Sequence, residues 1–267
     1  MVDEAEVNGV RVTYEIRGQG PPLLLLHGFG VDRRMWQPQV TALGASYTLI
    51  LCDMPGFGAS EDPPETKTYT SSDMVALVGH LGFNQVHLCG LSYGGAVALE
   101  MAIEHPALIA TLTLASSGIG GYEFSKEYIA QLKVSEDRAR AGELKAAQKN
   151  WLGSPLFKYV SNNPHWRAAL TEMVEDYRGW HWRHGFKRLN LQSIKHLEDV
   201  ECPTLVVVGA LDEPDFRAIA ECLVERIPNV ALMAIQETGH MLNFEQAEAF
   251  NGRLLEFLGH HPLIEVD

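Results

Sequence analysis

The sequence predicts an α/β protein with a mostly parallel, doubly wound sheet of about eight strands and a helical cap inserted after the sixth strand. Short apolar runs alternate with segments of helical periodicity over most of the chain, which is typical of strands buried between two helix layers. The alternation stops near residue 119 and resumes near residue 197. We therefore assign residues 1–118 and 197–267 to the core and 119–196 to the cap.

The first elements of the predicted core are an antiparallel edge and a buried strand. Residues 6–14 alternate apolar and polar side chains around Asn8-Gly9, which is a strong signal for a hairpin. Leu23 to Leu26 are apolar on both faces, so we expect a strand covered by helices on both sides. The Gly-rich loop 27–30 follows it directly, and there the backbone N–H of Phe29 is well placed to point into a site at the end of the strand.

The later elements follow from the same periodicity. Further strands are expected at 48–52, 86–89, 111–115, 202–209 and 230–235. Helices are expected around residues 34–43, at 72–81, after Ser92 as far as His105-Pro106, at 216–226, and at 243–258 as one closing amphipathic helix. His87 lies inside a strand, where we expect a hydrogen-bonded core residue.

Composition limits the class of protein. A chain of 267 residues with 46% hydrophobic residues can bury a large core without disulfides or a structural metal. Its four cysteines form no C-x-x-C pair, which favours reduced thiols in the cytoplasm. A net charge of -13 argues against nucleic acid and anionic membrane surfaces as partners. The first residues are acidic and the sequence has no long apolar run, so we expect neither secretion nor membrane insertion.

One serine lies in a strand–turn–helix context that favours a nucleophile. The strand at 86–89 runs into Gly90-Leu91-Ser92-Tyr93-Gly94, a G-x-S-x-G pattern, and an Ala- and Leu-rich helix follows. The alternative is a turn that binds phosphate. A dinucleotide loop needs glycine where Ser92 lies, however, and a P-loop needs a Lys-Ser/Thr pair that is absent here.

An acid and a histidine follow two later strands. Asp212 and His240 each come just after a predicted parallel strand, at the edge where open α/β sheets bind ligands. His240 is the candidate base for the serine proton, and Asp212 would orient and stabilise its imidazole. Asp215 competes for the role of the acid. We favour Asp212 because Pro214 and Asp215 are typical of the first turn of a helix.

At this point the sequence resembles the α/β-hydrolase superfamily, in its branch with a serine nucleophile. Five segments match in the family's order: HGFG at 27–30, DMPGFGAS at 53–60, GLSYGG at 90–95, GALDEPD at 209–215 and GHMLNFEQAEAFN at 239–251. Within the family the chain is most similar to small cap-bearing esterases, 3-oxoadipate enol-lactonases and cofactor-free haloperoxidases.

The resemblance implies hydrolysis of a small carboxylic ester or lactone through an acyl-serine intermediate, with no cofactor and no metal. It places an oxyanion hole at the backbone N–H groups of Phe29 and Tyr93. Alternatives with the same triad are a perhydrolase or haloperoxidase, a carbon–carbon bond hydrolase, or a ligand receptor or signalling protein. Ser92 argues against dehalogenases and epoxide hydrolases, which need an aspartate there. We expect a monomer or a small homo-oligomer whose partner is the small-molecule substrate.

The predicted cap is rich in aromatic residues. We expect Trp151, Trp180 and Trp182 to contact substrate together with Phe29, although packing is the alternative role for each. His181 and His184 have helical spacing but no third ligand, so no metal site is expected. The cap predicts a small and largely apolar substrate. A modest acidic group on it would be held by a cap cation that faces inward, and solvated helix faces are the alternative place for most of the candidates, which are Arg167, Arg178, Arg183, Lys187 and Arg188.

Overall fold

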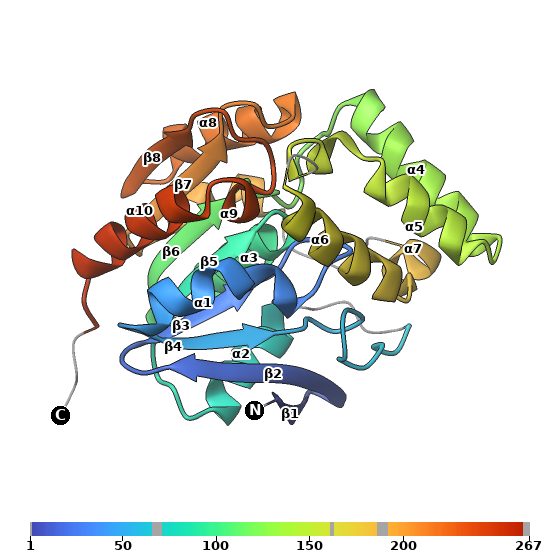
Figure 1. Cartoon of the computed structure of the whole chain (residues 1–267). Coiled ribbons are helices and arrows are strands. Elements are labelled where there is room, and N and C mark those ends of the chain that lie inside the picture. The colour runs from blue at the N-terminus through green and yellow to red at the C-terminus, as the bar shows by residue number, and fades with distance from the viewer. Residues whose placement is uncertain (1, 66–70, 161–162, 186–191, 264–267) are drawn as a thin grey trace.

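The computed structural model describes residues 2–65, 71–160, 163–185 and 192–263. Within these ranges the strands form one eight-stranded sheet in the order β1-β2-β4-β3-β5-β6-β7-β8 (Figure 1). The first two pairs, β1 with β2 and β2 with β4, are antiparallel, and all later pairs are parallel. The predicted fold class, a mostly parallel sheet of about eight strands, is confirmed.

The antiparallel edge is the predicted hairpin. β1 (Val2–Val7) pairs with β2 (Val10–Gly18), and the turn between them is Asn8-Gly9. Both turn residues have positive φ, 50° for Asn8 and 74° for Gly9, as the tight hairpin turns require. β2 then pairs antiparallel with β4 (Thr48–Cys52), which joins the hairpin to the parallel sheet.

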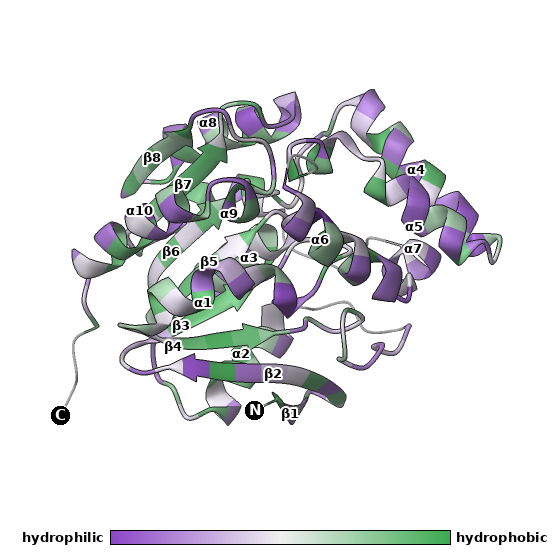
Figure 2. Cartoon of the chain, in the orientation of Figure 1, coloured by the Kyte–Doolittle hydropathy of each residue, from purple (hydrophilic) through white to green (hydrophobic). Residues whose placement is uncertain are grey.

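The central strands are buried along almost their whole length. They are β3 (Pro22–Leu26), β5 (Val86–Leu91), β6 (Ile109–Ala115) and β7 (Thr204–Gly209). Their apolar colour in Figure 2 follows from helices that cover both faces of the sheet. The edge strand β8 (Val230–Ile235) is more exposed, since it pairs on one side alone. As expected, His87 is buried in β5, 2.9 Å from the Thr111 hydroxyl through its Nδ1.

The core helices lie on both faces of the sheet. In Figure 1, α1 (Gln37–Gly44) and α10 (Ala247–Gly259) lie in front of the sheet, and α2 (Ser71–His80) and α3 (Tyr93–Glu104) lie behind it. α8 (Pro214–Arg226) packs on β7. The short helices η1 (Arg33–Trp36) and η2 (Pro106–Leu108) precede α1 and β6.

The prediction of a single closing helix over 243–258 is wrong. The chain forms the short α9 (Leu242–Glu245), leaves helical geometry at Gln246 (φ -136°, ψ 57°) and then forms α10. The break has a physical reason in the position of Glu245. Its carboxylate accepts hydrogen bonds from the backbone N–H groups of Gly239 and Met241, so α9 stays folded back against the preceding turn.

The segment between β6 and β7 is helical, as predicted. Its helices lie at the end of the sheet toward which the parallel strands point (Figure 1). They are α4 (Lys126–Arg140), α5 (Leu144–Leu152), η3 (Pro155–Phe157), α6 (Pro164–Asp176), α7 (Trp180–His184), η5 (Ser193–Lys195) and η6 (Leu197–Asp199).

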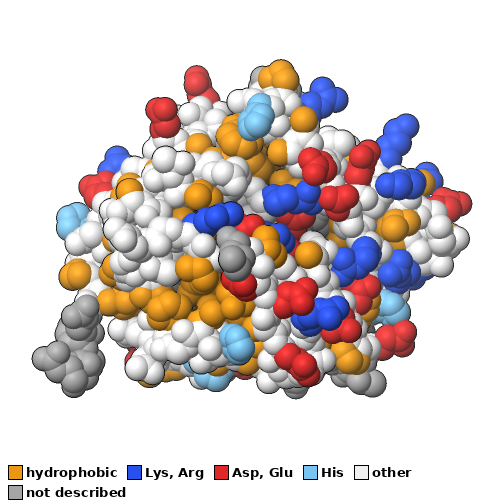
Figure 3. Space-filling model, turned by 60° about the horizontal axis from the view of Figure 1, so that its bottom comes forward, with side chains coloured by type: hydrophobic (Ala, Val, Ile, Leu, Met, Phe, Trp, Pro, Cys, Tyr) orange, Lys and Arg blue, Asp and Glu red, His pale blue; other side chains and the backbone are white. Residues whose placement is uncertain are grey.

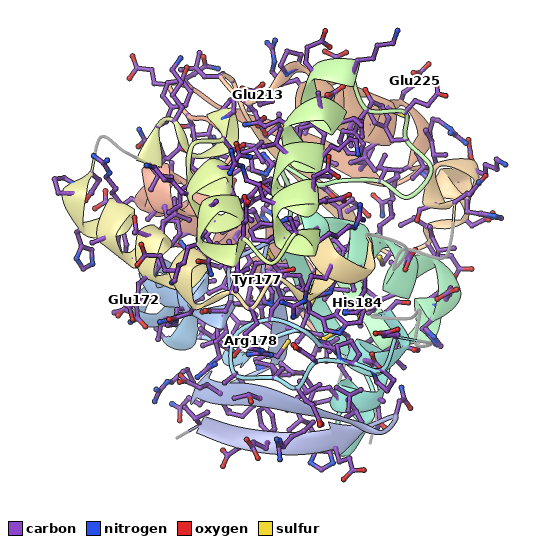
Figure 4. All side chains as sticks on the ribbon, turned by 90° about the vertical axis from the view of Figure 1, so that its right-hand side faces the viewer. Glu172, Tyr177, Arg178, His184, Glu213 and Glu225 are labelled. Carbon is purple, nitrogen blue, oxygen red and sulfur yellow. The ribbon has the colours of Figure 1, made fainter. Side chains whose placement is uncertain are left out.

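Two arginines tie these helices to the core. The Arg34 guanidinium of η1 bonds to the buried Asp32 and reaches Glu172 and Asp176 of α6, at 2.8 and 2.7 Å. From the cap side, Arg178 donates to the carbonyl oxygens of Gly58 and Ser60 and to the Asp62 carboxylate. Figure 4 shows Arg178 at the lower border of the cap helices, next to the core. Both contacts join segments more than a hundred residues apart, so they hold the cap at the carboxyl end of the sheet.

The surface carries charges of both signs. On the face shown in Figure 3, basic side chains lie among acidic ones, and apolar side chains form a band on its left side. In the described ranges, none of the helices is long and apolar enough to cross a membrane.

Candidate active site

Ser92 lies at the turn between β5 and α3 in a strained backbone conformation. Its φ of 56° and ψ of -112° are outside the regions that a serine ordinarily adopts. The turn is held by backbone hydrogen bonds, because the Ser92 N–H donates to the Ala115 carbonyl and the Ser92 carbonyl accepts from Ala96 and Gly118. A Cβ on Gly94 would lie 2.3 Å from the Leu26 carbonyl oxygen, so only glycine permits this approach of α3 to β3.

Asp212 and His240 form a buried hydrogen-bonded pair. The His240 Nδ1 lies 2.9 Å from one Asp212 carboxylate oxygen and 3.2 Å from the other. This contact places the imidazole proton on Nδ1, so that Nε2 is left as an acceptor. Among the described residues the buried Nε2 has no hydrogen-bond partner. The Asp212 carboxylate also accepts from the Glu213 N–H at 2.7 Å, which orients the acid.

Two further residues that sequence reasoning missed surround His240. The Glu245 carboxylate accepts from the backbone N–H groups on either side of His240, Gly239 at 2.5 Å and Met241 at 3.2 Å. Burial raises the pKa of Glu245. The Phe216 ring lies 4.2 Å from the imidazole, measured between ring centroids. Glu245 lies in the 239–251 segment, but nothing in that pattern marks its carboxylate as a partner of the His240 turn, and only the fold brings Phe216 to His240.

Hydrogen bonds of the buried His27 side chain fix the loop that carries Phe29. The His27 Nδ1 bonds to the Gly28 carbonyl at 2.8 Å and Nε2 accepts the Met54 N–H at 2.9 Å, so this histidine is neutral. Burial lowers the pKa of His27, which keeps the imidazole neutral. The Phe29 ring packs edge-on against Phe57, Tyr93, Trp151 and Tyr177. The loop is therefore rigid where it meets Ser92.

Two cavities adjoin Ser92. The larger has a volume of about 220 Å³ and is bordered by Phe29, Ser92, Tyr93 and an apolar set from the core and the cap, namely Ala96, Gly118, Ile119, Phe124, Tyr128, Ile129, Leu132 and Phe216. The smaller, of about 20 Å³, lies between Ser92, His240 and Trp151. Its volume is enough for about one water molecule. Tyr128 borders both cavities.

Of the three cap tryptophans expected to contact substrate, one borders a cavity next to Ser92 in the structure. Trp151 borders the smaller cavity. Among the described residues Trp180 and Trp182 border neither cavity: Trp182 packs on Tyr177 and Phe29, and Trp180 packs on His181 and His184. Trp182 therefore packs between cap and core, and Trp180 packs within α7; packing is the alternative role expected for both.

One of the candidate cap cations and the competing acid have other roles. Arg178 binds the core loop at Gly58 to Asp62, as described above, and does not border either cavity. Lys187 and Arg188 lie outside the described residues. Asp215 is in the first turn of α8, as predicted, and its carboxylate accepts hydrogen bonds from Ser125 of the cap.

His181 belongs to the aromatic cluster between cap and core. Its ring stacks on Phe57 at 4.1 Å, and its Nδ1 lies 3.1 Å from the Tyr177 hydroxyl (Tyr177 is labelled in Figure 4). Within the described part of the chain, no group of three or more His, Cys, Asp or Glu side chains is placed to hold a metal ion.

Comparisons with known proteins agree with this fold. The chain is 27% identical over 258 residues to a putative carbamate hydrolase, RutD, of Azorhizobium caulinodans, covering 92% of this chain and 94% of that protein. In structure it is similar to an esterase from Thermogutta terrifontis (TM-score 0.85, 25% identity, 98% of this chain and 100% of the other). It also shares its fold with the enol-lactonase of Burkholderia xenovorans LB400 (TM-score 0.85, 24% identity, 96% and 100%). A model of the alpha/beta hydrolase family matches residues 23–253. The chain therefore belongs to the alpha/beta hydrolase family.

Proposed function

We propose that this protein is a serine hydrolase that cleaves a small carboxylic ester or lactone, with Ser92 as nucleophile, His240 as base and Asp212 as the acid that orients it. One observation carries the proposal. The Asp212–His240 pair leaves a buried imidazole nitrogen with no partner in the described structure, at the border of the same small cavity as the strained Ser92. Proton abstraction needs a free acceptor in the same cavity as the serine hydroxyl.

The reaction follows from this arrangement. The Ser92 Oγ attacks the acyl carbon of the substrate as its proton passes to the His240 Nε2. The bond between the acyl carbon and the alcohol oxygen then breaks, and the alcohol leaves with that proton. Water attacks the acyl-serine in the same way, its proton moves through Nε2 to the Ser92 Oγ, and the carboxylic acid is released. We assign the oxyanion hole to the backbone N–H groups of Phe29 and Tyr93, both of which border the larger cavity.

The cavity chemistry supports a small, largely apolar acyl or alcohol group. No charged side chain is among the described residues that border the 220 Å³ cavity. A cavity of about 150 Å³ holds benzene in a model protein, so this one holds a group slightly larger than a benzene ring. The names of the similar proteins, a putative carbamate hydrolase, an esterase and an enol-lactonase, support assignment to the hydrolase class. The free thiols support the proposal of a cytoplasmic protein.

Turnover of a panel of p-nitrophenyl esters, lactones and carbamates tests the proposal. Wild type should hydrolyse short esters, and Ser92→Ala and His240→Ala should each lose nearly all of this activity, on the order of a million-fold at most, because triad members act as a unit. Ester turnover at the wild-type rate in either variant would refute the assignment. Stoichiometric acylation without turnover would favour a receptor, and peracid formation from hydrogen peroxide would favour the perhydrolase alternative.

A further inference from the structure

The contact between Ser125 and Asp215 joins the N-terminus of a cap helix to the segment that carries the candidate acid, Asp212. The Asp215 carboxylate accepts from the Ser125 N–H at 3.1 Å and from its hydroxyl at 2.6 Å. The same hydroxyl accepts from the Tyr128 N–H at 3.2 Å, so Ser125 is the N-cap of α4. The first turn of α4 is thus bonded to the first turn of α8. In Figure 4, Glu213, just before α8, lies near the upper end of the cap helices.

Residues next to this contact line the larger cavity. Phe124 and Tyr128 flank Ser125 in the chain and stack on each other at 4.7 Å. Both pack against Phe216, at 5.8 and 5.7 Å between ring centroids, and Phe216 in turn packs on the His240 imidazole. All three rings border the cavity at Ser92. The N-terminal end of α4 therefore supplies part of the wall of this cavity.

We propose that the Ser125–Asp215 contact is a specificity-determining element: it holds α4 over Ser92 and thereby limits the size of the acyl group that the site accepts. Asp215 and Ser125 act through Phe124 and Tyr128 and are positioning residues. The inference rests on the proposed function, because it concerns the substrate range of the same site. Ile129 and Leu132 of α4 also border the cavity, and Ile129 is exposed, so a shift of this helix would change the size of the cavity.

Four variants distinguish the effect of the Ser125–Asp215 hydrogen bonds from the effect of Ser125 as the N-cap of α4. Ser125→Asp keeps an N-cap acceptor for the Tyr128 N–H but places a second carboxylate against Asp215. Ser125→Thr keeps both the cap and the hydroxyl donor, so it is the rescue variant. Asp215→Asn weakens the acceptor from the other side. Asp137→Asn, at the exposed Lys133–Asp137 ion pair of the same helix, is the matched control.

The first readout is the ratio of kcat/KM for p-nitrophenyl hexanoate to that for p-nitrophenyl acetate. We expect it to rise about tenfold in Ser125→Asp and Asp215→Asn, mainly through a lower KM for the hexanoate. Ser125→Thr and Asp137→Asn should keep the wild-type ratio. An equal loss of kcat on both esters, or a Ser125→Thr variant that behaves like Ser125→Asp, would overturn the proposal.

The second readout does not depend on activity. Hydrogen exchange of the backbone amides at 126–130 should be faster in Ser125→Asp and Asp215→Asn than in wild type and in Asp137→Asn. Unchanged exchange in both variants would overturn the role of the contact even if the esterase proposal stands. If wild type hydrolyses no ester, the proposed function fails, and faster exchange would still support the contact as the element that holds α4.

Discussion

Gly209 and Gly239 meet backbone to backbone where β7 and β8 end. A Cβ on Gly209 would lie 2.1 Å from the Gly239 carbonyl oxygen and 2.4 Å from that of Thr238. The turn after β7 is tied to the same place, because the Leu211 N–H donates to the Thr238 carbonyl at 2.8 Å. Glycine at 209 therefore sets the distance at which the Asp212 and His240 turns approach each other.

Gly209→Ala should separate these two turns. We expect ester turnover to fall about 100-fold, because a displacement of catalytic groups on the order of 1 Å has an effect of this size. We also expect the free energy of unfolding to fall by about 1–3 kcal/mol, because the added methyl group overpacks the turn. Steady-state kinetics and urea unfolding measure the two effects. Gly252→Ala is the control, because a Cβ there meets nothing within 4 Å in α10 and should stabilise the protein by about 0.4–1 kcal/mol. Equal behaviour of the two variants would contradict the role of Gly209.

Asp212→Asn should lower kcat by about ten thousand-fold, because an amide no longer fixes the proton of His240 on Nδ1 or stabilises the charged imidazole. Asp215→Asn should cost far less kcat, since Asp215 contacts Ser125 and not His240. Kinetics on p-nitrophenyl acetate give the ranking. A larger loss of kcat in Asp215→Asn would move the acid to position 215.

Glu245→Gln should weaken the support of the His240 turn. The amide retains one oxygen acceptor where the carboxylate has two, so one of the N–H groups of Gly239 and Met241 loses its partner. We expect kcat to fall about tenfold and the melting temperature to fall by a few degrees. Glu248→Gln, an exposed change in α10, serves as the comparison. Wild-type kinetics in Glu245→Gln would show that these hydrogen bonds do not position the histidine.

Stability should fall as the pH is lowered through the range set by His87. Burial lowers the pKa of His87 from 6.5 to about 4 in the folded protein. Between these values the unfolded chain binds a proton that the folded protein does not, so acidification from pH 6.5 to 4 favours unfolding, by about 3 kcal/mol for this residue. His27, whose pKa is also lowered by burial, adds to the loss in the same direction.

Urea unfolding at several pH values tests this. His87→Gln should show a shallower loss of stability than wild type over this range, because the amide does not titrate. His80→Gln, at the exposed end of α2, should follow the wild-type curve. A His87→Gln curve parallel to that of wild type would contradict the assignment.

Local patterns were sufficient for the sheet and for the candidate catalytic residues. The turn at Ser92 and the positions after β7 and β8 depend on neighbours within a few residues, and the structure places Asp212 and His240 2.9 Å apart. The contacts that the sequence did not reveal are long-range. Ser125 and Asp215 are 90 positions apart, and Arg178 meets Asp62 at a separation of 116.

The structure differs from the expected structure at the closing helix, and it gives Trp180 and Trp182 their alternative role. Helical periodicity continues through Gln246, but the hydrogen bonds of Glu245 to the His240 turn stop the first helix there. Trp180 and Trp182 are aromatic residues of a cap, yet nothing in their spacing distinguishes a ring that faces a cavity from one that packs on Phe29 or His184.

The central claim is that Ser92 forms a covalent acyl intermediate. Rapid mixing of the protein with excess p-nitrophenyl acetate, followed by acid quench and intact-mass measurement, tests it most directly. The account predicts an acetyl adduct that peptide mapping places on Ser92, that accumulates in wild type and that is absent in Ser92→Ala. Ester turnover with no adduct in wild type and with full activity in Ser92→Ala would contradict it.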